Sequence, residues 1–103
     1  RETLMTTLNI HKNETLRTKG IVAAVGPHAT DTVSPNLWRS IADVAATMEL
    51  PIHAHVAQSI EEYHRIRQRH DCTPVELLKE TGVLDCGASM LMVHSMFVTQ
   101  GDL

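Results

Sequence analysis

Three short apolar runs, separated by segments long enough to form helices, constrain the fold of this chain most strongly. The runs occupy residues 21–25, 52–56 and 90–93. They read as apolar rather than alternating strands, which is typical of strands buried in a parallel sheet. Parallel strands need a crossover of a dozen or more residues, and both intervening segments are longer than that. The order predicts an α/β fold of about three parallel strands with flanking helices, in either a doubly wound sheet or part of a (β/α)8 barrel.

Helix signals precede and follow the first run. Apolar side chains at helical spacing predict a helix over residues 2–13, followed by a turn that ends at Gly20. Ser34 then supplies an N-cap oxygen ahead of Pro35 at the first helical position. Apolar side chains recur at helical spacing from there to Met48, so we expect a second helix that ends before the next run.

Two further helices are each expected to begin with a capping box, in which a side-chain oxygen and a glutamate exchange hydrogen bonds with backbone amides. The boxes pair Ser59 with Glu62 and Thr73 with Glu76. The first helix should extend to about Arg69, and Gly82 should end the second. Residues 99–103 are expected to begin another helix.

Composition excludes several classes of function. The 103 residues fit one small domain, and 9 basic against 12 acidic residues give a net charge of -3. With one Trp, one Tyr and one Phe, the chain lacks stacking platforms for bases, so we expect no nucleic-acid partner. No apolar stretch approaches the roughly 20 residues of a membrane span, so we expect no membrane partner. Cys72 and Cys86 form no C-x-x-C pair, which favours reduced, structural cysteines and a cytoplasmic location.

Histidines gather at the carboxyl ends of the predicted strands. Of the seven in the chain, His28 follows the first run, His53 and His55 lie within the second, and His94 follows the third. The loops at this edge of a parallel sheet converge on one face, where ligands bind. Because side chains two apart on a strand share a face, His53 and His55 could enter one pocket or one core. A shared metal or proton-transfer site is one prediction, and chance placement in a histidine-rich chain is the alternative.

Five short motifs follow one another along the chain: G-P-H-A at 26–29, T-V-S-P at 32–35, P-I-H-A-H-V-A at 51–57, T-P-V-E-L-L at 73–78 and V-H at 93–94. Their order resembles the central part of the amidohydrolase superfamily. The resemblance is to the cytosine-deaminase-like branch, which contains methylthioadenosine/S-adenosylhomocysteine deaminases and triazine hydrolases. It implies a metal-dependent (β/α)8 TIM barrel, of which residues 1–103 would be a central fragment, strands four to six.

The resemblance also implies roles for the histidines. His55 matches the metal ligand of strand five, and His94 matches the strand-six histidine beside the metal-bound water and the substrate. His28 matches a substrate-binding histidine, whereas His53 carries no catalytic role. The implied cofactor is a divalent metal, Zn²⁺ or Fe²⁺ in the complete protein, and the implied reaction is attack of its water on a C–N or similar bond of a small-molecule heterocyclic substrate.

Gln58 departs from the family pattern. The family motif H-x-H-x-x-E has a proton-carrying glutamate three residues after the ligand, and this chain has Gln58 there. A carboxamide has no titratable proton near neutral pH. His94 could then move the proton alone, Asp31 could supply a substitute carboxylate, the reaction could differ from deamination, or the site could be weak. Alternatively, Gln58 orients a ligand or caps the helix beginning at Ser59.

Length is the second departure. A (β/α)8 barrel takes roughly 250 residues, and the ligands that the family places on strands one and eight are not in this chain. Because the chain also begins with Arg1 inside a helix-like pattern, we expect a piece of a longer enzyme, inactive when isolated. Open sheet edges favour a homo-oligomer. The rival interpretation is a non-catalytic degenerate homologue or α/β interaction module. A small nucleotide-binding domain is disfavoured, because no glycine-rich loop follows any predicted strand.

Overall fold

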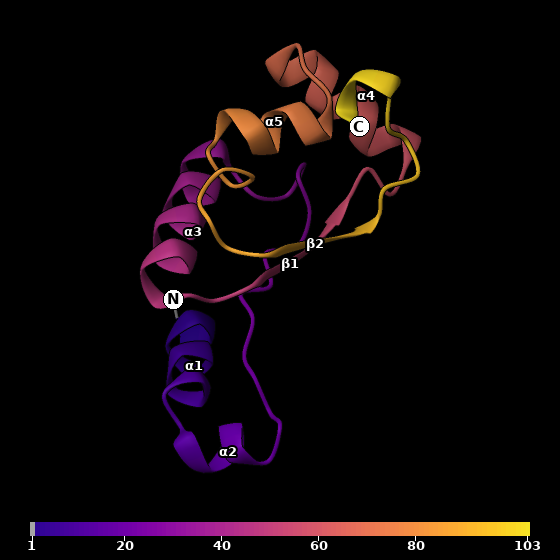
Figure 1. Cartoon of the computed structure of the whole chain (residues 1–103). Coiled ribbons are helices and arrows are strands. Elements are labelled where there is room, and N and C mark those ends of the chain that lie inside the picture. The colour runs from indigo at the N-terminus through magenta and orange to yellow at the C-terminus, as the bar shows by residue number, and fades with distance from the viewer. Residues whose placement is uncertain (1) are drawn as a thin grey trace.

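The computed structural model describes residues 2–103 as helices packed against a small parallel sheet (Figure 1). The predicted α/β class is confirmed, whereas the element order differs at the first apolar run. Along the chain the elements are α1 (Glu2–His11), α2 (Glu14–Thr18), α3 (Pro35–Met48), β1 (Ile52–Val56), α4 (Ile60–His70), α5 (Pro74–Glu80), β2 (Met90–His94) and the 3-10 helix η1 (Gln100–Asp102). No helix within residues 2–103 has both the length and the apolar character that crossing a membrane requires.

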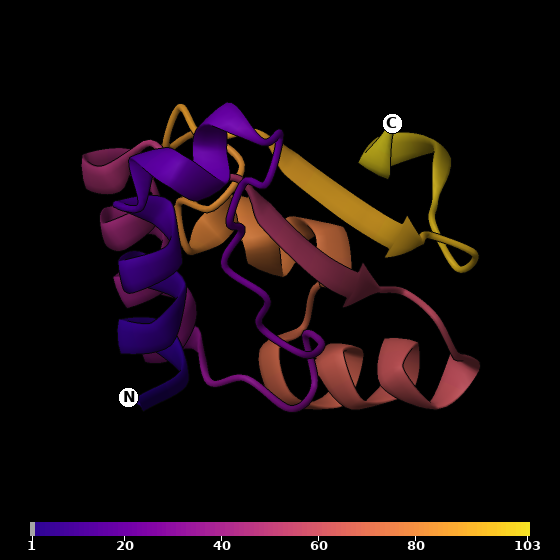
Figure 2. The same ribbon diagram turned by 90° about the horizontal axis from the view of Figure 1, so that it is seen from below.

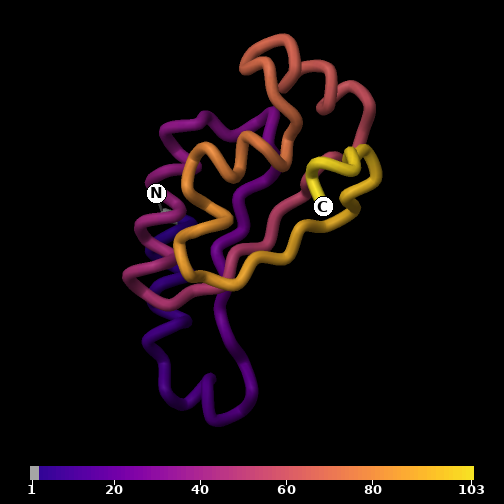
Figure 3. The backbone as a smooth tube through the Cα atoms, turned by 45° about the horizontal axis from the view of Figure 1, so that its top comes forward, coloured from indigo at the N-terminus to yellow at the C-terminus, as the bar shows by residue number. Residues whose placement is uncertain are grey.

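The sheet is parallel, and its register is regular from Ile52 opposite Met90 to Val56 opposite His94. The segment carrying the first apolar run lies along the other edge of β1, as the tube in Figure 3 shows. It pairs there only through isolated parallel bridges, Val25 with Ile52 and Ala29 with His55. The prediction of a strand over residues 21–25 is therefore wrong in extent.

Helices cover one face of the sheet (Figure 2). The main core lies between that face and helices α3 and α5, and the buried Trp38 and Leu78 anchor it from the two helices. A smaller cluster joins Ile66 of α4 to Cys72 and to Leu77 of α5. The side chains of β1 alternate, with Ile52, Ala54 and Val56 buried and the histidines between them exposed or half-buried. The helices therefore bury one face of β1, and His53 and His55 lie on the other.

Local capping signals place the helix ends well. Ser34 Oγ accepts a hydrogen bond from the Leu37 amide at 3.2 Å, and Thr73 forms the complete predicted capping box with Glu76. Gly82, with φ +85°, follows the end of α5 as expected. Two predictions need correction. The expected turn before Gly20 contains the short helix α2, and the helix start expected at residues 99–103 is the single 3-10 turn η1, which Thr99 caps.

Candidate active site

Three histidine rings form a row at the carboxyl end of the sheet. The ring centroids of His28 and His55 lie 5.6 Å apart, edge to face, and those of His55 and His94 lie 5.3 Å apart, nearly stacked. The rings come from the loop before α3, from β1 and from the last residue of β2. The expectation that these three side chains meet on one face is confirmed, whereas their roles stay predictions. Within the described residues, the ring contacts of this row do not include His53.

The backbone at the end of β2 turns His94 toward this row. In the parallel ladder, His94 is the partner of Val56, whose side chain is fully buried. Regular alternation would therefore direct His94 toward the helices and away from His55. Instead His94 has φ +78° and Ser95 has φ +49°, in the left-handed region that residues other than glycine rarely adopt. This break in the alternation accompanies the stacking of His94 on His55, and such conformations cluster at functional sites.

Hydrogen bonds fix the orientation of two of these rings. His55 Nδ1 lies 3.1 Å from the carbonyl oxygen of His28, and because a carbonyl only accepts, Nδ1 carries the proton. His28 Nδ1 lies 2.9 Å from the hydroxyl of Thr32, which in turn donates its only proton to the Ala29 carbonyl at 3.3 Å. The hydroxyl therefore accepts from His28 Nδ1. In their neutral forms both rings then keep an unprotonated Nε2, which can bind a metal or accept a proton.

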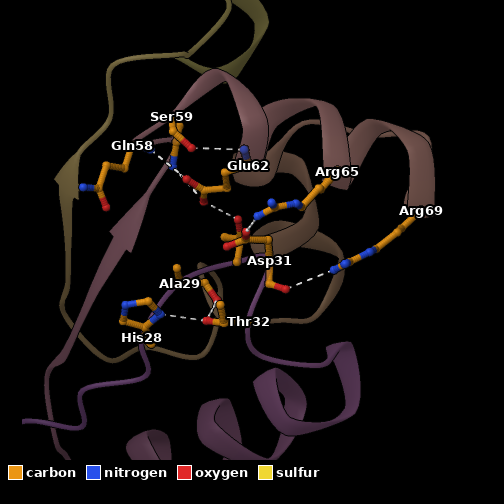
Figure 4. A network of polar contacts seen from close by, with 11 residues as sticks. His28, Ala29, Asp31, Thr32, Gln58, Ser59, Glu62, Arg65 and Arg69 are labelled. Atoms are coloured by element: carbon orange, nitrogen blue, oxygen red, sulfur yellow. Dashed lines mark hydrogen bonds and ion pairs between the residues drawn. The ribbon is translucent and has the colours of Figure 1, made fainter.

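Gln58 lies in the turn after β1 with its side chain exposed. Its backbone N–H donates to Glu62 Oε2 at 2.7 Å, so the position of the turn does not depend on the carboxamide. Figure 4 shows that the carboxamide points away from the Glu62 carboxylate. The suggestion that Gln58 caps α4 is wrong, because Ser59 is the N-cap and its Oγ accepts from the Glu62 amide at 3.1 Å.

Glu62 is a functional candidate that the sequence did not reveal. It is 3% exposed, and its carboxylate accepts hydrogen bonds from the amides of Ala57 (3.1 Å) and Gln58 (2.7 Å) and from the Thr30 hydroxyl. The predicted capping box at Ser59 is therefore half right, since this carboxylate bonds the two amides before Ser59. The spacing from serine to glutamate was the available signal, but it gives no sign of burial.

Asp31 is held by helix α4. Its Oδ2 atom lies 2.8 Å from Arg65 Nη1, and its backbone carbonyl accepts from Arg69 at 3.0 Å (Figure 4). The carboxylate is 11% exposed and paired with a cation. The hypothesis that Asp31 replaces the missing glutamate therefore gains no support from the geometry.

The row is not a complete metal site. Within the described part of the chain, no group of three or more His, Cys, Asp and Glu side chains is arranged to hold an ion. His55 still has the features of a single ligand, because its Nδ1–H is tied to a carbonyl and its Nε2 is free, as in most metal-binding histidines. Imidazole suits both Zn²⁺ and Fe²⁺. The residues present thus fit one position of a metal site and not the whole of it.

Comparison with known proteins identifies the family. The sequence model of the amidohydrolase family matches residues 4–102. The chain belongs to the amidohydrolase family. It is 36% identical over 83 residues to the 5-methylthioadenosine/S-adenosylhomocysteine deaminase of Halothermothrix orenii, covering 81% of this chain and 19% of that protein. It is 34% identical over 83 residues to the 5'-deoxyadenosine deaminase of Methanothermobacter thermautotrophicus, with the same coverage of both proteins.

A solved structure shows the fold to which the amidohydrolase segment corresponds. The crystal structure of an adenosine deaminase from Xanthomonas campestris with bound Zn matches it with a TM-score of 0.81 at 19% identity. The match covers 96% of this chain and 22% of that one. The expectation of a partial (β/α)8 barrel is confirmed. The chain spans about a fifth of the length of the curated relatives it matches.

Proposed function

We propose that this amidohydrolase segment forms strands four to six of a metal-dependent deaminase that releases the amino group of an adenine nucleoside. The observation that carries the proposal is the row of His28, His55 and His94 at the carboxyl edge of the parallel sheet. Ligands bind at this edge in parallel α/β folds. The deaminase names of the relatives support the reaction class.

Each histidine of the row takes a separate task in this proposal. His55 binds the metal through its free Nε2. His94, stacked on His55, carries a proton between water and the departing amine, because an imidazole nitrogen can both accept and donate a proton. His28 binds the substrate through its own Nε2. When bound, a divalent Zn²⁺ or Fe²⁺ ion supplies Lewis acidity that lowers the pKa of a water in the site.

Gln58 has an orienting task in this scheme. Its exposed carboxamide can donate and accept hydrogen bonds, so it can position the water or the amino group of the substrate. Because it cannot carry a proton, proton transfer depends on His94 among the residues of this segment. The isolated 103 residues supply one metal ligand from the row, and we expect them to be inactive alone.

The test uses the complete enzyme that carries this segment. His55→Ala should abolish both ammonia release from 5'-methylthioadenosine and the zinc content measured by elemental analysis. His53→Ala is the matched control, because His53 lies on the same face of β1 without a ring contact to the row. Equal losses in the two variants would overturn the assignment of His55. A zinc-containing parent that releases no ammonia from any adenine nucleoside would support the rival, a non-catalytic homologue.

We also propose that the isolated chain forms a homo-oligomer. Leu91 on β2 and Met96 after it are 55% and 69% exposed, and Val22 at the opposite edge is 74% exposed. Clusters of exposed apolar side chains beside unpaired strand edges favour association. Light scattering should give a multiple of the 11.4 kDa chain mass. A monodisperse species at the monomer mass would contradict the proposal.

A further inference from the structure

The carboxylate of Glu62 connects the segments that carry the histidine row. Its bonds to Ala57 and Gln58 hold the turn after β1, two to three residues beyond His55. Its bond to Thr30 holds the loop before α3, two residues beyond His28. Glu62 lies in the first turn of α4, so one side chain ties two loops of the site to a helix.

The same network reaches the end of β2. The carbonyl oxygen of Ala57 accepts hydrogen bonds from the amides of Met96 and Phe97, both at 3.1 Å. The carbonyl of Val56 accepts from Ser95 at 2.9 Å. These amides directly follow His94. The peptide units next to Ala57 are thus bonded on one side to Glu62 and on the other to the segment that holds the third histidine.

The backbone of Ala57 needs such support. Its φ of +52° is left-handed, a conformation that is unfavourable for a residue with a Cβ because the Cβ approaches the following carbonyl oxygen. Ala57 is also fully buried, so its amide has no access to water. An acceptor must be provided from within the protein, and Glu62 provides it.

We propose that Glu62 is a positioning residue, which sets the relative placement of His28, His55 and His94 through the turn at Ala57 and the loop at Thr30. Glu62 touches no ring of the row and acts through the backbone that carries them. The inference concerns the geometry of the row. Its consequence for turnover rests on the proposed function.

A glutamine in place of Glu62 would preserve shape but not the hydrogen bonds. Oε1 accepts from Thr30 and Ala57, and Oε2 accepts from Gln58. A carboxamide has one acceptor oxygen and one NH2 group. Whichever way it is turned, its NH2 group faces at least one backbone N–H, and that bond is lost. Glu61→Gln is the matched control, because Glu61 is exposed in the same turn of α4 and its loss removes the same charge.

The first readout needs no activity. Long-range proton–nitrogen correlation spectra of the 103-residue chain report which ring nitrogen of each histidine carries the proton. In Glu62→Gln, we expect His28 and His55 to change from the Nδ1–H form to a mixture of tautomers and the His94 signals to shift. His11, on α1, serves as the internal reference. Glu61→Gln should give the parent spectrum.

The second readout is turnover by the complete enzyme. There Glu62→Gln should lower kcat about 10- to 100-fold, with a smaller change in KM. Small misplacements of reacting groups slow the chemical step more than they weaken substrate binding. Glu61→Gln should stay within about twofold, as expected for a surface change. Unchanged ring spectra in a folded Glu62→Gln variant would overturn the positioning role, whether or not the enzyme is a deaminase. If Glu62→Gln shifts the ring spectra but the parent enzyme has no deaminase activity, the positioning role stands and the proposed function is overturned.

A milder variant covers the case in which Glu62→Gln does not fold. Thr30→Val removes one hydroxyl and leaves both amide bonds to Glu62 in place. It should change the ring spectrum of His28, whose loop loses its anchor, and leave that of His94 unchanged. Equal spectra for Thr30→Val and the parent would overturn the proposal.

Discussion

Introducing a glutamate at position 58 is the most direct test of the chemistry proposed for this amidohydrolase segment. Gln58→Glu in the complete enzyme places a titratable group three residues after His55. General acid–base catalysis by a placed side chain contributes about 10²- to 10⁴-fold in rate, or about 2.7–5.4 kcal/mol of barrier. Because His94 already transfers the proton in our scheme, we expect the lower end, a gain of about 10²-fold in kcat.

The structure indicates that this substitution costs little stability. The hydrogen bond at position 58 that holds the turn comes from the backbone amide, and the side chain is exposed. A new negative charge near the start of α4 is favoured by the helix dipole by about 0.3–1 kcal/mol. The Glu62 carboxylate beside the turn opposes it. We therefore expect the free energy of unfolding to change by less than about 0.5 kcal/mol.

The assay is steady-state ammonia release from 5'-methylthioadenosine by parent and variant enzymes of equal zinc content. Gln68→Glu is the control, since it makes the same chemical change at an exposed position of α4. A variant at position 58 that is folded, zinc-loaded and no faster than its parent would refute the reasoning. That result would favour the degenerate homologue.

Two further predictions concern the remainder of the chain. Burial first, and nearby carboxylates second, raise the pKa of the Cys72 thiol, so alkylation at pH 8 should label the partly exposed Cys86 before Cys72. The protonated Cys72 thiol therefore contributes to the free energy of unfolding fully below the ordinary thiol pKa of 9.0, and this contribution is lost as pH rises through the higher pKa of the folded state. Urea unfolding at several alkaline pH values measures the loss. Glu49 has φ +54° at the end of α3, a conformation that glycine adopts without strain. Glu49→Gly should therefore raise the free energy of unfolding by about 0.5–1 kcal/mol and the midpoint of thermal unfolding by a few degrees. Asp71→Gly, at the same φ, should gain less, because aspartate tolerates this conformation better, and equal gains would contradict that reason.

Helix ends, which depend on residues close together in the sequence, could be predicted from the sequence. The N-caps of α3 and α5 are set by side chains within three residues of the amides they bond, so the local pattern was sufficient. The run at residues 21–25 was overpredicted because a strand also needs continuous pairing, and this segment pairs with β1 only through isolated bridges. Ile21 and Val22 are apolar enough for a buried strand, yet they are 48% and 74% exposed in the described chain.

In the candidate site, the placement of the histidines could be predicted but their orientation could not. The carboxyl ends of parallel strands share an edge, so the order of the elements was enough to place His28, His55 and His94 at one edge of the sheet. Their orientation depends on two features that no spacing encodes. One is the left-handed backbone at His94, which breaks the alternation of β2. The other is the burial of Glu62, which shares its spacing from Ser59 with any capping glutamate but bonds to Thr30, 32 residues away in the chain. In this segment the glutamine at position 58 therefore says little about the rest of the site, because the carboxylate that holds the turn comes from α4.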